Sequence, residues 1–179
     1  RSFQDRPVEV NKLKRLFEAA RWSASCYNEQ PWRYILGIKN QGNTYDKLFD
    51  ILASFNQNWC KSVPVLMLFC TKTVYEKTGN INEWAVYDLG QTATYISIQA
   101  INEGLYVHQM AGFSKEKAKT VFKLPDDIIP VTVMAVGYKD DPDKLPQDLR
   151  DSEISERIRS PINKKVFSHD WGDMHPLYQ

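Results

Sequence analysis

The run from Val63 to Cys70, VPVLMLFC, constrains the fold more than any other segment of this chain. It is short, continuous and apolar, which fits a β-strand buried on both faces better than an amphipathic strand with one wet face. A strand of that kind needs packing layers above and below it. We therefore place it centrally in a sheet flanked by helices.

Helical and strand patterns follow one another on both sides of this run. We predict helices over about 9–22, 44–53, 82–103 and 115–122, and strands over 32–38, 105–110 and 129–138. One face of the long helix, which Gly104 closes, is marked by small and apolar residues: Ala85, Leu89, Ala93, Ile96 and Ala100. This helix is the expected spine of the domain.

Length and composition favour one domain over residues 1–179. The chain has 179 residues, of which 42 % are hydrophobic, and it contains no repeat and no linker long enough to divide it. Beyond Asp140 the composition becomes polar and charged, and residues 157–179 carry too few apolar side chains to form a core of their own. We expect a C-terminal extension, about 160–179, that packs on another surface.

Charge and cysteine usage narrow the class of function. The 23 Lys and Arg residues balance 22 Asp and Glu residues, so the charge implies neither a nucleic-acid partner nor a membrane partner. Cys26, Cys60 and Cys70 are odd in number and lack CxxC spacing, which argues against a disulfide framework and a zinc site and favours a reducing, cytoplasmic setting. His169 and His175 fit no established metal-ligand spacing, so we predict no metal.

No stretch approaches the roughly 18 to 20 apolar residues of a membrane span. The chain begins at Arg1 rather than at Met, so we expect residues upstream of it.

The stretch from Ser23 to Trp32, SASCYNEQPW, joins a helix to a strand through small, hydrogen-bonding residues. Such a loop lets backbone amides and hydroxyls approach a polar ligand, although the same residues also act as an ordinary helix stop. With its flanks this stretch reads EAARWSASCYNEQPWR, Glu18 to Arg33, and it resembles the nitroreductase family of FMN-dependent oxidoreductases in order and spacing.

This resemblance implies a nitroreductase-like α+β fold, with a central mixed β-sheet flanked by helices and a C-terminal extension onto the partner subunit of a homodimer. Two FMN molecules would lie at the interface, with Ala24, Ser25, Cys26 and Asn28 of one subunit contacting the FMN of the other. Ala24 stands where relatives commonly have proline, and Cys26 stands where many have serine.

The resemblance extends to basic residues at both ends of the chain. Arg1, in RSFQDRPV, is similar to a residue of the family's opening signature that points at FMN, on its phosphate or pyrimidine side. Arg157 and Arg159, in ERIRSP, resemble the C-terminal basic pair that completes the phosphate site. Guanidinium groups suit a phosphate dianion, whereas solvated surface arginines are the alternative interpretation.

Two further segments carry flavin contacts by resemblance. Asn56 matches an amide that meets the pyrimidine edge of the flavin, with Asn58 as the register alternative and a helix cap as the competing role. In Val107 to Phe113, VHQMAGF, the resemblance places backbone amides against flavin N5 and O4. It assigns flavin contacts to Gln109, Met110, Ala111 and Gly112. The neighbouring His108 is more simply structural.

The activity implied is a ping-pong transfer of hydride from NADH or NADPH, through flavin N5, to a nitroaromatic, quinone or similar small-molecule acceptor. No side-chain acid or base is required, because the cofactor performs the chemistry. Tyr87 and Gln91 are candidates for the substrate side. The alternatives are a dedicated metabolite reaction on the same fold, such as dehalogenation or dehydrogenation, and a flavin-binding protein without turnover.

Overall fold

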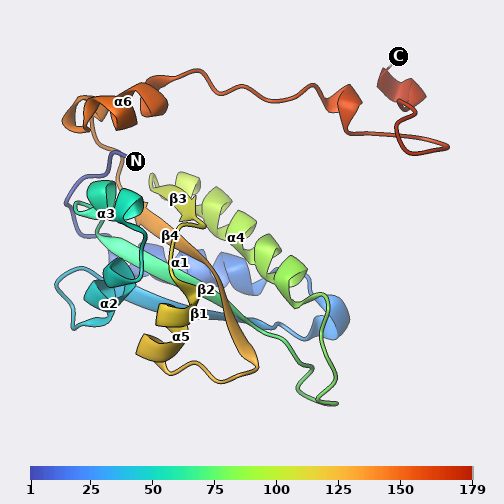
Figure 1. The fold of residues 1–179 in the computed structure, drawn as a ribbon, viewed down its shortest axis with the longest axis horizontal. Helices are drawn as coiled ribbons and strands as arrows, with labels where there is room; N and C mark the ends of the chain where they lie inside the picture. The colour runs from blue at the N-terminus through green and yellow to red at the C-terminus, as the bar shows by residue number, and fades with distance from the viewer. Residues whose placement is uncertain (179) are drawn as a thin grey trace.

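The computed structural model describes residues 1–178 and shows four strands with helices on both sides of them (Figure 1). The strands are β1 (Trp32–Ile38), β2 (Val65–Lys72), β3 (Tyr106–Met110) and β4 (Ile128–Gly137). The α-helices are α1 (Val10–Arg21), α2 (Thr44–Asp50), α3 (Ser54–Cys60), α4 (Ala85–Asn102), α5 (Lys115–Phe122) and α6 (Gln147–Ile154). Four 3-10 segments complete the described chain: Cys26–Asn28, Pro142–Lys144, Ile162–Lys164 and Pro176–Tyr178.

The sheet has the order β1-β2-β4-β3, and every neighbouring pair within the described residues is antiparallel. The α+β class is confirmed, but the expectation of a mixed sheet is wrong for this chain. The reason lies in the β2-α4-β3 connection, which returns β3 in the same direction as β2 without placing the two strands side by side. β4 fills the gap between them and runs opposite to both.

The apolar run lies where the sequence placed it, at the centre of the sheet. β2 lies between β1 and β4, and all of its residues except the last are buried. Its pairing with β4 shifts between Phe69 and Cys70, where the partner residues change from Thr132 to Pro130. A proline has no amide hydrogen for the ladder, so a bulge is a place where an interior strand tolerates it.

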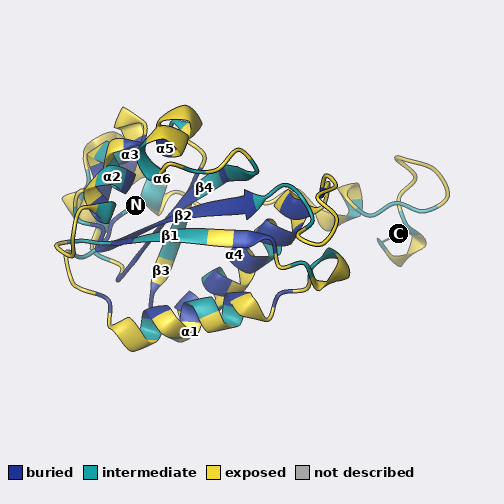
Figure 2. Cartoon of the chain, turned by 90° about the horizontal axis from the view of Figure 1, so that it is seen from below, coloured by how far each residue is buried: buried dark blue, intermediate teal, exposed yellow. Residues whose placement is uncertain are grey.

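Alternation along β2 divides the interior into two cores. Leu66 and Leu68 face one cluster, which includes buried residues of α2, α3 and α5. Met67 and Phe69 face the opposite cluster, which α1 and α4 cover. Figure 2 shows the consequence for α1 and α4, whose buried faces turn toward the sheet while their outer faces are exposed.

The long helix behaves as its pattern predicts. All five residues of the predicted small and apolar face are buried, and Gly104 follows the helix with a φ of 71°, a left-handed conformation that suits glycine at a helix end. α1 packs along α4.

Two short helices, α3 and α6, are not predicted from the sequence. α3 carries the polar sequence SFNQNWC and buries Asn56, Trp59 and Cys60. α6 lies in the charged segment beyond Asp140, and Leu149 is its buried residue. α3 is seven residues long and one of its three buried residues is polar, and α6 has a single buried residue, so neither helix shows a periodic apolar pattern in the sequence.

The segment after α6, residues 155–178, extends away from the rest of the chain (Figures 1 and 2). Its large apolar side chains are mostly exposed, and Trp171 is 91 % exposed. Near its end the segment folds on itself, with the Phe167 and Trp171 rings 4.9 Å apart and a bridge from Phe167 to Met174. We call residues 155–178 the tail. No helix within residues 1–178 is both long enough and apolar enough to cross a membrane.

Gly37 provides a test of this packing. A Cβ atom at Gly37 would lie 2.7 Å from the Tyr45 Cα and 2.9 Å from the Leu48 Cδ1. Because backbone of α2 cannot yield, we expect Gly37→Ala to lower the free energy of unfolding by about 3 kcal/mol in urea denaturation.

Gly90 is the matched control, because it lies in α4 and a Cβ atom there meets nothing within 4 Å. Gly90→Ala should leave stability unchanged or raise it by up to about 1 kcal/mol. Equal effects of the two substitutions would contradict the packing described for β1 and α2.

Candidate functional site

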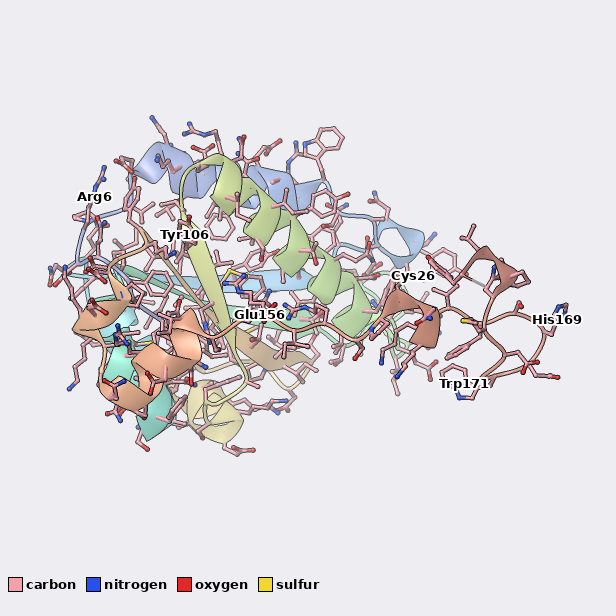
Figure 3. All side chains as sticks on the ribbon, turned by 90° about the horizontal axis from the view of Figure 1, so that it is seen from above. Arg6, Cys26, Tyr106, Glu156, His169 and Trp171 are labelled. Carbon is pink, nitrogen blue, oxygen red and sulfur yellow. The ribbon has the colours of Figure 1, made fainter. Side chains whose placement is uncertain are left out.

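A cavity of about 390 Å³ opens between the N-terminal residues, β3 and the region of α6. Its charged lining comprises Arg1, Lys139, Arg157, Glu153 and Glu156, and His108 lies among them. Figure 3 shows Tyr106 on β3 and Glu156 just after α6, both of which line it. We call this space the N-terminal cavity.

The first residues of the chain are fixed against the end of β4. Phe3 forms a bridge with Lys139, the Asp140 amide donates to the Ser2 carbonyl at 3.0 Å, and the Ser2 hydroxyl donates to the Asp141 carbonyl at 2.7 Å. The Arg1 backbone nitrogen lies 2.8 Å from Glu153 Oε2 on α6. These contacts hold Arg1 at the cavity wall.

The Arg1 guanidinium retains an unused donor. Its Nε atom is buried and has no hydrogen-bond partner among residues 1–178. A buried donor without an acceptor costs free energy, and an anion that entered the cavity would meet the same guanidinium group, because Arg1 is one of the lining residues. Arg157 and Arg159 are both exposed, but only Arg157 lines the same cavity, and Arg159 donates to the Ile158 carbonyl at 3.0 Å.

His108 lies between the cavity and the core. Its ring meets the Trp59 ring edge-on at 4.8 Å. Burial lowers the pKa of His108 most, and the positive charges of the Arg1 amino group and guanidinium lower it further, to about 4. The ring is therefore neutral at pH 7.

Asn56 and Gly112 are brought together, as neighbouring site residues would be. The Asn56 Nδ2 donates to the Gly112 carbonyl at 2.9 Å, and the Asn56 Oδ1 accepts from the Trp59 Nε1 at 3.2 Å. A Cβ atom at Gly112 would lie 2.8 Å from Asn56 Nδ2, so this contact needs glycine. The alternative role of Asn56 as a helix cap is wrong, because Asn56 lies inside α3 and Ala53 is the N-cap residue.

The end of β3 presents its residues in alternation. Gln109, Ala111 and Gly112 are exposed. Met110 instead points into the core, where its sulfur lies 3.7 Å from the Cys60 Sγ. The expectation that the Met110 side chain lines a flavin ring is therefore wrong in this chain, because the strand alternation turns it inward.

The turn from Ser23 to Gln30 has an unusual backbone. Tyr27, Asn28 and Gln30 adopt left-handed φ values of 53°, 57° and 51°. Such conformations are costly for residues other than glycine and tend to cluster at functional sites. The Ser25 hydroxyl holds the turn by accepting from the Gln30 amide at 3.0 Å. Ala24 and Asn28 are exposed.

Asp88 on α4 secures this turn, and the sequence did not reveal it. Asp88 is 2 % exposed, and its Oδ2 accepts from the Cys26 amide at 3.1 Å. The available signal was a carboxylate on the otherwise apolar face of α4. The Tyr75 hydroxyl donates to the Cys26 Sγ at 3.5 Å, and this bond raises the pKa of Tyr75 to about 12.

One chain does not bring all the predicted residues together. The turn is attached to the first turns of α4, whereas the N-terminal cavity lies beside β3, just beyond the other end of that helix (Figure 3). At 1.5 Å per residue the helix separates them by about 25 Å. Tyr87 and Gln91 lie on the turn side of α4, with Tyr87 exposed and its ring edge-on to Trp84 at 6.1 Å.

Comparison with known proteins finds similar sequences and similar folds. The sequence profile described as "Nitroreductase family" matches residues 1–58. A crystal structure described as an oxidoreductase containing FMN superposes with a TM-score of 0.90 at 24 % identity, covering 97 % of this chain and 88 % of that one. A nitroreductase family protein from Clostridium difficile superposes with a TM-score of 0.69 at 24 % identity, covering 92 % and 89 %.

Two relatives match in sequence. An uncharacterized 15.4 kDa protein of Mycolicibacterium smegmatis is 27 % identical over 79 % of this chain and 98 % of its own length. A protein of Methanothermobacter thermautotrophicus, provisionally named an NADH dehydrogenase or NAD(P)H nitroreductase, is 25 % identical over 77 % of this chain and 71 % of its own length.

The class that fold and comparisons define is therefore the α+β proteins of nitroreductase fold. The resemblance to the nitroreductase family is confirmed, in sequence over residues 1–58 and in fold over nearly the whole chain.

Asn56 gives a test of the junction between α3 and Gly112. Asn56→Asp removes the donor to the Gly112 carbonyl and buries a carboxylate, so we expect it to lower the free energy of unfolding by about 2 kcal/mol in urea denaturation. Asn58→Asp, at the exposed register alternative, should stay within about 0.5 kcal/mol of wild type. The reverse order would show that Asn58 carries the structural role.

The His108 environment predicts a pH dependence of stability. An unfolded histidine has a pKa near 6.5, whereas the folded value is about 4, so the unfolded state binds more protons between these values. Stability is full above pH 6.5 and is lost as the pH falls toward 4. Allowing for solvent screening at the partly open ring, we expect wild type to lose about 1 kcal/mol more than His108→Asn between pH 7 and 5. If both proteins lost the same unfolding free energy between pH 7 and 5 in urea denaturation, the prediction would be contradicted.

Proposed function

We propose that this chain is an FMN-dependent oxidoreductase that passes hydride from NADH or NADPH to a nitroaromatic, quinone or similar small-molecule acceptor. The observation that carries the proposal is the unpaired Arg1 Nε in a cavity that Arg157 and Lys139 also line. Three cationic side chains around an unused buried donor suit the phosphate of FMN. The FMN-containing oxidoreductase of the same fold and the provisional name of the Methanothermobacter relative support the choice of cofactor and reductant.

The remaining residues suit the other parts of the cofactor. The exposed backbone at Ala111 and Gly112 offers amides to the ring system, and Gln109 lies exposed beside them. Asn56 fixes the position of Gly112 through its own hydrogen bond, with one amide hydrogen left for the pyrimidine edge. In this proposal Met110 contributes its backbone alone, since its side chain is in the core.

When bound, FMN supplies hydride transfer at its N5 atom, in alternation between the nicotinamide and the acceptor. The chain supplies binding and orientation. Arg1 and Arg157 hold the phosphate end, and the loop at Ala111 and Gly112 orients the ring. This division of roles needs no side-chain acid or base.

A homodimer completes the proposed site. Ala24, Ser25, Cys26 and Asn28 of one copy would reach the FMN held by the other, which accounts for the separation along α4 within one chain. Tyr87 and Gln91 would then face the acceptor. The tail supports the same assembly, because its exposed Ile158, Trp171 and Leu177 side chains could be buried against an apolar surface of the second copy. The free thiols of Cys26, Cys60 and Cys70 suit a reducing, cytoplasmic setting.

The purified protein tests the proposal directly. We expect it to be yellow or to become so on incubation with FMN, and to bleach anaerobically with NADH or NADPH. Reoxidation rates with nitroarenes, quinones and other acceptors would then rank the substrate classes. Protein that stays colourless with excess FMN would overturn the proposal, and yellow protein that neither nicotinamide bleaches would leave a flavin-binding protein without turnover.

A matched arginine pair sharpens this test. Arg157→Ala should weaken FMN binding about 10-fold, because it removes one charge-assisted contact to the phosphate, and should leave riboflavin binding unchanged. Arg159→Ala, at an exposed side chain outside the cavity, should have a smaller effect. Equal losses for FMN and riboflavin in Arg157→Ala would contradict a phosphate contact.

A further inference from the structure

His108 lines the N-terminal cavity, and the proposed function gives it no role. It lies on β3, at the edge of the sheet, and its ring packs against Trp59 of α3 while lining the cavity. Trp59 in turn stacks on Phe3 with ring centres 6.1 Å apart. His108 thus contacts the core on one side and lines the cavity on the other, where an imidazole can donate a hydrogen bond.

The charges around His108 come from every part of the cavity wall. Arg1 acts on it with both its amino group and its guanidinium. Lys139 lies beyond the end of β4, and Arg157 follows α6. Two carboxylates, Glu153 on α6 and Glu156 just after it, partly offset these cations. Trp59, the contact from α3, is uncharged. The cationic side chains outnumber the carboxylates by three to two, and together with burial and the Arg1 amino group they oppose a further positive charge in an empty cavity.

We propose that His108 takes up a proton when a phosphate group enters the N-terminal cavity, so that it binds the phosphate as an imidazolium and makes FMN binding proton-coupled. This inference rests on the proposed function, because the phosphate is taken to be that of FMN. One proton moves from solvent to the imidazole, and no covalent bond to the ligand forms.

The electrostatic cause is a change of sign in the cavity. A phosphate carries a charge of about −1.5 to −2 at pH 7, which more than cancels the surplus positive charge that, after burial, keeps His108 neutral. The anion therefore stabilises the protonated ring and raises the pKa of His108 from its low value in the empty cavity. Because His108 binds a proton in the complex and not in the free protein, its contribution to FMN affinity increases as the pH falls through this interval.

The phosphate itself titrates in the same range and acts in the opposite direction. Its second pKa is near 6, so acidification weakens the ligand charge. The informative quantity is therefore the ratio of FMN affinities of wild type and His108→Asn at each pH, from which the ligand's own titration cancels. His169→Asn, in the tail, is the control for a histidine outside the cavity.

Flavin fluorescence titrations between pH 7 and 5 provide the measurement. We expect the ratio of wild-type to His108→Asn affinity for FMN to grow about threefold or more per pH unit, against a limit of tenfold for one whole proton. For riboflavin, which lacks the phosphate, the ratio should stay constant. The ratio for His169→Asn should also stay constant.

Two outcomes separate this inference from the function on which it rests. FMN binding with a constant ratio would overturn the role of His108 and leave the proposed function intact. Failure of both proteins to bind FMN at any pH would overturn both. Should His108→Asn fold poorly, the wild type answers alone, because NMR titration of its histidine rings should show the pKa of His108 rising when FMN is added. An unchanged His108 pKa with bound FMN would overturn the proton uptake.

Discussion

The burial of β2 on both faces is the constraint on which the rest of the structure depends. Its side chains enter two separate cores in alternation, one beneath α2, α3 and α5 and one beneath α1 and α4. The other strands extend the sheet on either side of β2. Helices α3 and α4, which carry candidate site residues, each cover one of its two cores. The candidate residues at the ends of β3 and β4 therefore lie where the strands end and backbone groups are no longer paired within the sheet.

At one such end, segments from three parts of the chain meet. The N-terminal residues lie along the end of β4, α6 returns beside them, and His108 reaches across from β3. Glu153 holds the Arg1 backbone, while the Arg1 Nε is left without a partner in the described chain. Under the proposed function, this arginine would be positioned for the phosphate before FMN binds.

The sequence predicted the fold where a pattern repeats and missed it where single contacts decide. The continuous run of β2 and the small face of α4 were sufficient, because burial sets their periodicity. The sequence did not predict α3 and α6, since α3 buries the polar Asn56 and α6 buries only Leu149, so neither shows a periodic apolar pattern. Of the candidate site, the family resemblance singled out Asn56 and Gly112 separately, and their mutual contact is known only from the structure. The inward turn of Met110 and the buried Asp88 under the Cys26 amide depend on three-dimensional neighbours.

The length of α4 has a consequence for stoichiometry. It works as a rigid spacer that keeps the strained turn and the cationic cavity of a chain permanently apart. Under the proposed function, each chain thus owns half of two different sites and all of none. Association of two copies would complete both sites in a single step. Dissociation on dilution would remove the partner's turn from both sites together.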